Sequence, residues 1–191
     1  MKVVLTGPHC CGKTTVLKAL RDTLKVPDNV GFLESFGKDC PIDYSDSEFL
    51  RSHPETEVRL TYWMLSDLVK REVEGMSRYE HLVLDRCIVD QIVYPVEILG
   101  KDKLPSSIDY FVRDWTERES YSHVFLFPAN PKFLAKGGTK DKNPEFQQKI
   151  ADLYRELLDE YKIRYELLPV DQEVQIQLVS DYLRQNLLLS F

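Results

Sequence analysis

The chain has 191 residues, of which 43% are hydrophobic and 29% are charged, and its formal net charge at pH 7 is −6. This length and composition are those of one globular domain with a sizeable core, which we expect to span residues 1–191. The acidic balance argues against a general nucleic-acid binder, because such proteins need a basic face.

Short apolar strands alternate with helices along the chain. The predicted strands span residues 3–5, 30–34, 81–86, 122–127 and 165–168. The predicted helices span residues 15–20, 55–74, 143–164 and 172–188, where apolar side chains recur at helical spacing. We expect Gly75 to end the second of these helices, and Asn143 with Pro144 to begin the third. Strands that alternate with helices predict a parallel sheet covered on both faces.

Apolar runs and cysteines indicate the compartment. No apolar run is long enough to span a bilayer, and the first one is too short for a signal peptide. The four cysteines have the spacing of neither a disulfide framework nor a zinc site. We therefore expect a cytoplasmic protein that has neither a membrane nor a nucleic-acid polymer as its partner.

The first predicted strand leads into a loop that matches the phosphate-binding pattern G-x-x-x-x-G-K-[ST] at every fixed position. Glycine lets the backbone fold tightly, so that N–H groups point at a phosphate chain, and the following helix adds its positive dipole end. In this pattern Lys13 reaches the β- and γ-phosphates, and the Thr14 hydroxyl binds Mg²⁺. The predicted nucleotide-binding residues of the loop are Gly7, Pro8, His9, Cys10, Cys11, Gly12, Lys13, Thr14 and Thr15.

Charged residues follow two of the other predicted strands. In folds of this type, ligands bind beyond the carboxyl ends of the parallel strands. Glu34 ends the second predicted strand, and Asp85 with Arg86 ends the third. A carboxylate after an apolar strand is the second Mg²⁺ group of P-loop enzymes, so Thr14 and Asp85 are the predicted metal-binding residues. The alternative for Asp85 is that it caps the helix that follows it.

These features occur in the order that is typical of one enzyme group. The P-loop, Glu34, the Asp85–Arg86 pair and a Lys-rich segment before the penultimate helix resemble the P-loop nucleoside and nucleotide kinases. That group includes the thymidylate kinases, the deoxynucleoside kinases, the ribosylnicotinamide kinases and small ATPases that carry the AAA label. The resemblance spans nearly the whole chain, with the P-loop as its specific part and Asp90 and Tyr94 as weaker support. It implies an α/β, three-layer P-loop NTPase fold, with a five-stranded parallel sheet of order 2-3-1-4-5 and helices on both faces.

The resemblance also implies an activity, namely Mg²⁺-dependent transfer of a phosphoryl group from ATP to a small-molecule acceptor. The implied catalytic residues are Lys13, Glu34, Asp85 and Arg86. Glu34 stands where the deoxynucleoside kinases place the carboxylate that takes the proton from the acceptor hydroxyl, and Asp90 is the fallback base. Arg86 resembles the family arginine that holds a phosphate with its planar fork. The alternatives are a solvent-exposed Glu34 without a role and a surface ion pair for Arg86.

Two further segments receive roles from the resemblance. Pro169, Val170 and Asp171 follow the last strand, where relatives use backbone groups to meet the adenine ring. Residues 128–143 resemble a lid that can move over the phosphates. The basic residues of this lid are Lys136, Lys140 and Lys142. Most relatives have arginines there, and lysine supplies charge without bidentate geometry, so a solvated basic loop is the alternative.

Two other classes of P-loop protein do not fit the sequence. A GTPase would need a base-reading Asn/Thr-Lys-x-Asp, and Thr139-Lys140-Asp141-Lys142 has its acid one position early. An AAA-type motor would need Asp-Glu after the third strand and a second, helical domain. A nucleotide-binding regulatory or switch ATPase without small-molecule kinase activity stays open. So do a nucleoside, a nucleoside monophosphate or ribosylnicotinamide as acceptor, GTP in place of ATP as donor, and a homodimer as the assembly.

Overall fold

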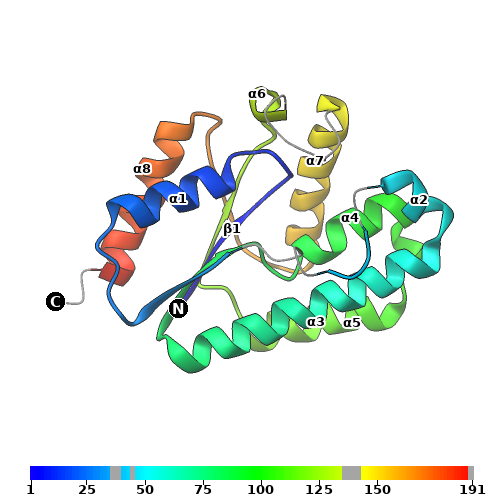
Figure 1. Cartoon of the computed structure of the whole chain (residues 1–191), viewed down its shortest axis with the longest axis horizontal. Coiled ribbons are helices and arrows are strands. Elements are labelled where there is room, and N and C mark those ends of the chain that lie inside the picture. Colours follow the sequence, from blue (N-terminus) through cyan, green and yellow to red (C-terminus); the bar gives the residue numbers. More distant parts are fainter. Residues whose placement is uncertain (35–39, 44–45, 135–142, 189–191) are drawn as a thin grey trace.

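A computed structural model describes residues 1–34, 40–43, 46–134 and 143–188 of the chain. Its strands form one five-stranded sheet in the order β2-β3-β1-β4-β5, and all four pairings are parallel. The strands are β1 (Lys2–Thr6), β2 (Val30–Leu33), β3 (His81–Asp85), β4 (His123–Leu126) and β5 (Glu166–Leu167). The parallel sheet predicted from the alternation of elements and the strand order implied by the resemblance are both confirmed (Figure 1).

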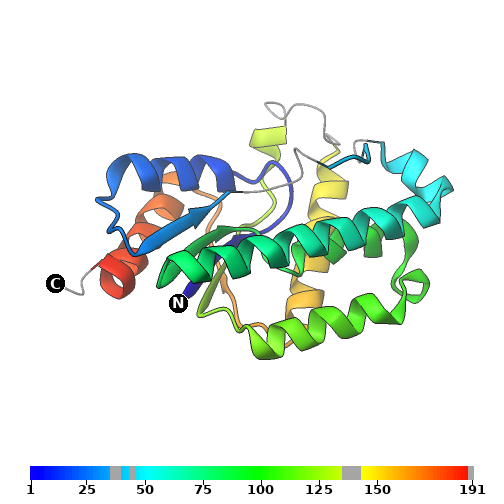
Figure 2. The ribbon, with the colours of Figure 1, turned by 60° about the horizontal axis from the view of Figure 1, so that its bottom comes forward.

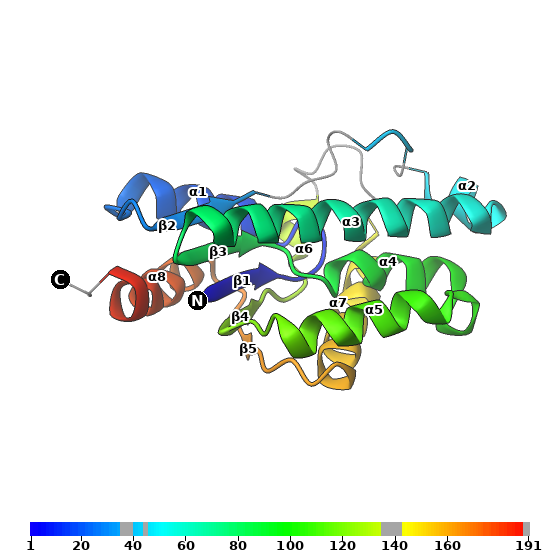
Figure 3. The same ribbon diagram turned by 90° about the horizontal axis from the view of Figure 1, so that it is seen from below.

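Helices cover both faces of this sheet (Figure 3). On one face lie α1 (Lys13–Thr23) and α8 (Gln172–Leu183), and on the other lie α3 (Pro54–Arg78), α4 (Asp90–Leu99), α5 (Ser106–Arg118) and α7 (Pro144–Glu160). The alternation of side chains along β1 explains the two layers, because successive residues of a strand point to opposite faces. Val3 and Leu5 pack with α1 and α8, whereas Val4 packs with the helices of the other face.

The remaining helical segments are short. They are α2 (Ser47–Ser52), α6 (Pro131–Leu134), the 3₁₀ turn η1 (Lys101–Lys103) and the π-helical turn η2 (Arg184–Leu188). Figure 2 shows that α3 runs past the sheet toward α2, so its N-terminal half lies beyond the carboxyl ends of the strands. In the part of the chain that the structure describes, no helix is both long enough and apolar enough to cross a membrane.

Two expectations about the helices were wrong or incomplete. Gly75 does not end the long helix, which continues to Arg78. A Cβ atom at Gly75 would lie 3.0 Å from Leu82 of β3, so the position needs a small residue for close helix–sheet packing and is no stop signal. The structure also adds α2, α4, α5 and α6 to the predicted helices. In α5 the buried residues are Ile108 and Val112.

Candidate functional site

The backbone of the phosphate-binding loop has the conformation that its glycines were predicted to allow. Gly7, Gly12 and Cys10 have φ values of 138°, 101° and 52°. A Cβ atom at Gly7 would lie 2.6 Å from the backbone oxygen of Phe127, and at Gly12 it would lie 3.4 Å from the ring of Phe133. Both glycines therefore serve positive φ and close packing of the loop against the segment after β4.

Lys13 begins α1 and is buried within the loop. Its Nζ atom donates hydrogen bonds to the backbone oxygens of Gly7 and Pro8, at 2.6 and 2.7 Å, and lies 3.4 Å from Cys11 Sγ. Thr14 and Thr15 are exposed at the start of the same helix. The ammonium group is thus held inside the loop, and the Thr14 hydroxyl is accessible to solvent and ions.

His9 is buried and contacts Tyr94 of α4 and Phe146 of α7. Its backbone N–H donates to the Tyr94 hydroxyl at 3.0 Å, and its ring Nδ1 lies 2.9 Å from the same oxygen. The ring also lies 5.9 Å from that of Phe146, centroid to centroid. Burial raises the pKa of the Tyr94 hydroxyl above its usual value, so this hydroxyl stays protonated. Here the role of His9 is to anchor the loop to α4.

Asp85 lies in the strand next to the loop. It is the last residue of β3, it pairs with Leu5 in the register of β1, and it is only 5% exposed. The next helix begins at Asp90 with Val89 as its N-cap, so the alternative that Asp85 caps this helix is wrong. The hydroxyl of Thr14 and the carboxylate of Asp85 are hard oxygen donors of the kind that Mg²⁺ prefers, and Mg²⁺ needs few protein ligands when phosphates and water supply the rest. The donor chemistry therefore fits Mg²⁺.

Arg86 has a backbone conformation that is rare for its type, with a φ of 88°. Such strain persists only where the surrounding structure enforces it, and it is common at functional sites. Its backbone N–H donates to Leu5 O at 2.9 Å. The side chain is 18% exposed, and its Nη1 lies 4.0 Å from Oδ1 of the buried Asp90. The alternative of a surface ion pair for Arg86 is therefore wrong.

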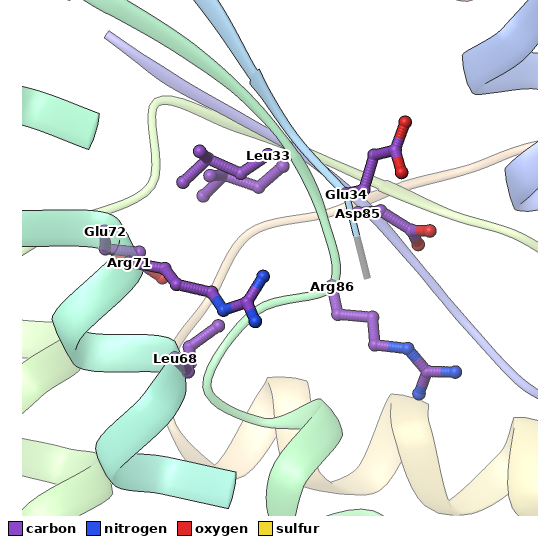
Figure 4. A pocket seen from close by; sticks show the side chains of 8 residues that line it. Leu33, Glu34, Leu68, Arg71, Glu72, Asp85 and Arg86 are labelled. Carbon is purple, nitrogen blue, oxygen red and sulfur yellow. The ribbon is translucent and has the colours of Figure 1, made fainter. Parts of the chain in front are cut away.

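Glu34, Asp85 and Arg86 line one small pocket at the ends of β2 and β3 (Figure 4). The remaining lining residues are Leu33, Leu68, Arg71, Glu72 and Leu84. Its volume of about 10 Å³ is close to the space of one water molecule. Sequence reasoning missed Arg71, which comes from α3 and whose Nε donates to Asp67 at 2.7 Å. The only signal for Arg71 was its place on a polar helix face, which many other charged residues share.

The carboxylate of Glu34 has a partner from the other face of the sheet. It forms an ion pair with Arg21 of α1, and its side chain is 60% exposed. Arg21 also donates to Phe32 O at 3.2 Å and lies over the Phe32 ring. Because Leu33 pairs with Leu84, Glu34 follows β2 beside Asp85, one strand further from the P-loop. Glu34 therefore lies at the carboxyl ends of the strands, on the same side of the sheet as the predicted metal site.

Asp90 has a structural role that the sequence did not indicate. Its Oδ2 accepts hydrogen bonds from Thr6 Oγ1 at 2.6 Å and from the Cys87 N–H at 2.8 Å, and its Oδ1 accepts from the Tyr154 hydroxyl at 2.8 Å. The carboxylate therefore ties β1, the start of α4 and α7 together. A buried group that accepts three hydrogen bonds is poorly suited to take a proton from a substrate, so the structure does not support Asp90 as the fallback base.

The loop after β5 and the predicted lid can be followed only in part. The Asp171 side chain caps α8 by accepting from the Glu173 and Val174 N–H groups, at 2.9 and 3.1 Å. Val170 is exposed, and Pro169 O accepts from Gln175 Nε2 at 2.6 Å. In the lid, the described residues are 128–134 and 143. The predicted phosphate contacts Lys136, Lys140 and Lys142 lie outside the described residues.

Comparison with known proteins gives a family and a fold. A family model described as an AAA domain matches residues 2–175. No curated protein matches the chain. Among solved structures, deoxyadenosine kinase from M. mycoides with bound dATP matches with a TM-score of 0.70 and 16% sequence identity, over 96% of this chain and 99% of that one. The same enzyme with bound dCTP matches with a TM-score of 0.68 and 16% identity, over 97% and 100% of the two chains.

A third structure of that kinase, with the products dCMP and a flexible dCDP bound, matches with a TM-score of 0.66 and 15% identity, over 97% and 100% of the two chains. At this level of identity the likeness concerns the fold. The strand order, the P-loop and the full-length match agree with the resemblance seen in the sequence. The chain therefore belongs to the AAA domain family that its residues 2–175 match, and it has the fold of the P-loop deoxynucleoside kinases.

Proposed function

We propose that this protein transfers a phosphoryl group from ATP, in the presence of Mg²⁺, to a small nucleoside- or nucleotide-like acceptor. The observation that carries the proposal is the meeting of three groups at adjacent strand ends. Lys13 is held inside a P-loop after β1, and Asp85 and the strained Arg86 follow β3, the direct neighbour of β1. This is the arrangement that phosphoryl transfer requires, since the protein mainly positions groups and stabilises charge.

Each of these residues has a role that its position supports. Lys13 neutralises the charge on the β- and γ-phosphates. Thr14 and Asp85 would hold Mg²⁺, which would supply positive charge against the negative charge of the phosphates. Arg86, which lines the pocket of Figure 4, holds an acceptor or donor phosphate oxygen.

Glu34 is the proposed general base toward the acceptor hydroxyl. It lines the same pocket as Asp85 and Arg86, and its exposed carboxylate can exchange its partner Arg21 for a substrate hydroxyl at low energetic cost. A general base must lie within hydrogen-bond distance of the group whose proton it takes. Without substrate this contact is often long, and it shortens in the complex.

A nucleotide-binding regulatory ATPase that transfers nothing is the second candidate. The Glu34–Arg21 ion pair is the observation that favours it, because it engages the proposed base from outside the pocket. A switch of this kind would bind nucleotide tightly and would not need a base for an acceptor.

The experiment that tests the proposal is a transfer assay with ATP labelled at the γ-phosphate. Purified protein, Mg²⁺ and ATP are incubated with nucleosides, nucleoside monophosphates or ribosylnicotinamide, after a thermal-shift screen of the same compounds. We expect at least one labelled product, and we expect Lys13→Ala to abolish it. Tight ATP binding without any labelled product would favour the regulatory ATPase, and failure of the wild type to bind ATP would refute both candidates.

A further inference from the structure

Four consecutive backbone oxygens of the phosphate loop accept hydrogen bonds from two side chains. Lys13 Nζ donates to the backbone oxygens of Gly7 and Pro8. Gln147 of α7 binds the next two backbone oxygens: its Nε2 donates to His9 O at 2.8 Å and to Cys10 O at 3.3 Å. Figure 1 shows α7 beside the loop that follows β1. The hydrogen bond to His9 joins residues that are 138 positions apart in the chain. No pattern in the sequence indicates this contact.

Gln147 is wholly buried, with an exposed fraction of 0%. Its Oε1 accepts a hydrogen bond from the Asn130 backbone N–H at 3.0 Å, in the segment after β4. Asn130 is also buried, and its Nδ2 lies 3.4 Å from Val170 O in the loop after β5. One side chain thus connects the P-loop directly to the segment after β4 and, through Asn130, to the loop after β5. These are the three loops to which the sequence assigned nucleotide contacts.

The direction in which a peptide oxygen points fixes the direction of the neighbouring N–H groups. A loop can offer a row of N–H groups to a phosphate only if its oxygens point elsewhere. Buried oxygens also need a donor, since an unmet hydrogen bond in the interior costs free energy. Cys10, with its left-handed φ of 52°, is the residue of this stretch whose conformation most needs such support.

We infer that Gln147 is a positioning residue, which holds the His9–Cys10 stretch of the P-loop in the conformation that binds nucleotide phosphates. The inference rests on the proposed function only in that the loop binds the phosphates of ATP. The amide has one workable orientation, because its two oxygen partners can only accept and the Asn130 N–H can only donate. A carboxylate in its place would keep the contact with Asn130 and would repel both loop oxygens.

The test compares Gln147→Glu and Gln147→Met with the wild type and with Gln148→Glu. Gln148 is the matched control, because it is the next residue of α7, is exposed, and donates to Asp152 of its own helix at 3.0 Å. Calorimetric titration measures the affinity for ATP and for inorganic tripolyphosphate, both with Mg²⁺. Tripolyphosphate has no adenine, so its affinity reports on the phosphate loop alone. We expect both Gln147 variants to bind both ligands at least about tenfold more weakly, since two hydrogen bonds that order the loop are lost. Gln148→Glu should bind both ligands like the wild type.

A steady-state assay separates positioning from mere damage to the fold. The KM for ATP should rise in the folded variants, while their circular dichroism stays that of the wild type. Folded Gln147 variants with unchanged affinity for both ligands would overturn the inference and leave the proposed kinase intact. A wild type that binds neither ligand would instead refute the proposed function. If neither variant folds, the side-chain amide resonances of Gln147 in the wild type decide the question. They should shift when tripolyphosphate is added, and no shift would overturn the inference.

Discussion

The surroundings of Glu57 predict how the stability of the protein changes with pH. It lies in the first turn of α3 and is only 1% exposed, and its Oε2 has no hydrogen-bond partner among the residues that the structure describes. Burial raises the pKa of this carboxyl from its usual 4.5 to about 7, because the charged form loses its hydration. The folded protein therefore holds a proton on Glu57 at pH values where the unfolded chain has released it.

The sign and size of the effect follow from this difference. A carboxyl whose pKa is raised on folding stabilises the protein most below pH 4.5, and that stability is lost as the pH rises through about 7. A rise from 4.5 to about 7, at about 1.4 kcal/mol for each pH unit, amounts to about 3 kcal/mol. Glu57→Gln cannot ionise, so it should be more stable than the wild type at pH 8 by up to about 3 kcal/mol. For a chain of this size that corresponds to roughly 6–12 °C in melting temperature.

The assay is urea unfolding of wild type and Glu57→Gln at several values between about pH 5 and pH 8, the range in which the carboxyl changes its charge. The difference between the two free energies of unfolding should grow with pH in favour of the variant. Glu55→Gln is the matched control, because Glu55 is exposed in the same helical turn. Glu55→Gln should lower the stability of the protein slightly, because an acidic side chain stabilises a helix near its N-terminus. A pH profile of Glu57→Gln parallel to that of the wild type would refute the reasoning.

Three further predictions concern the proposed reaction. Lys13→Ala should weaken ATP binding or at least remove turnover while the fold survives, and calorimetric titration with a parallel transfer assay checks this; equal affinity and equal turnover would contradict it. Asp85→Asn should slow turnover far more than it weakens ATP binding, because it removes a Mg²⁺ group; an unchanged rate and Mg²⁺ dependence would argue against the metal role. Glu34→Gln should leave ATP affinity nearly unchanged and reduce transfer to the acceptor by at least roughly a hundredfold, the usual contribution of a general base. If a found acceptor is phosphorylated at the wild-type rate by that variant, Glu34 is not the base.

The part of the fold that the sequence could predict is the part governed by local patterns. Strand periodicity and the P-loop motif predicted β1, its glycine turn and α1, and the alternation of elements predicted a parallel sheet. Periodicity carries no information about which strands are neighbours, so the order came from the resemblance to a family. Gly75 shows the limit of local signals, because a glycine can serve packing against Leu82 as well as helix termination.

The candidate site likewise contains residues that local patterns predict and residues that they do not. Lys13 could be placed because it belongs to the P-loop motif after β1, and Asp85 and Arg86 because they lie at the end of β3. The carboxyl ends of parallel strands lie at the same side of the sheet, where ligands bind. Their partners could not be predicted, because they come from distant parts of the chain. Gln147 lies 138 residues from the His9 oxygen that it covers, and its type and spacing match no motif. Only the packing of α7 against the loop reveals it.

Glu34 and Asp90 show why the chemistry of a carboxylate depends on such partners. The sequence offers both as bases, and it ranks Glu34 first only by its place after a strand. In the structure Asp90 is buried and accepts hydrogen bonds from Thr6, Cys87 and Tyr154, so both of its oxygens already have donors. Glu34 is exposed and its ion pair is with Arg21, a pairing that water and salt weaken. A base must be able to release one partner and accept a proton from another, and of these two carboxylates it is Glu34 whose surroundings permit that exchange.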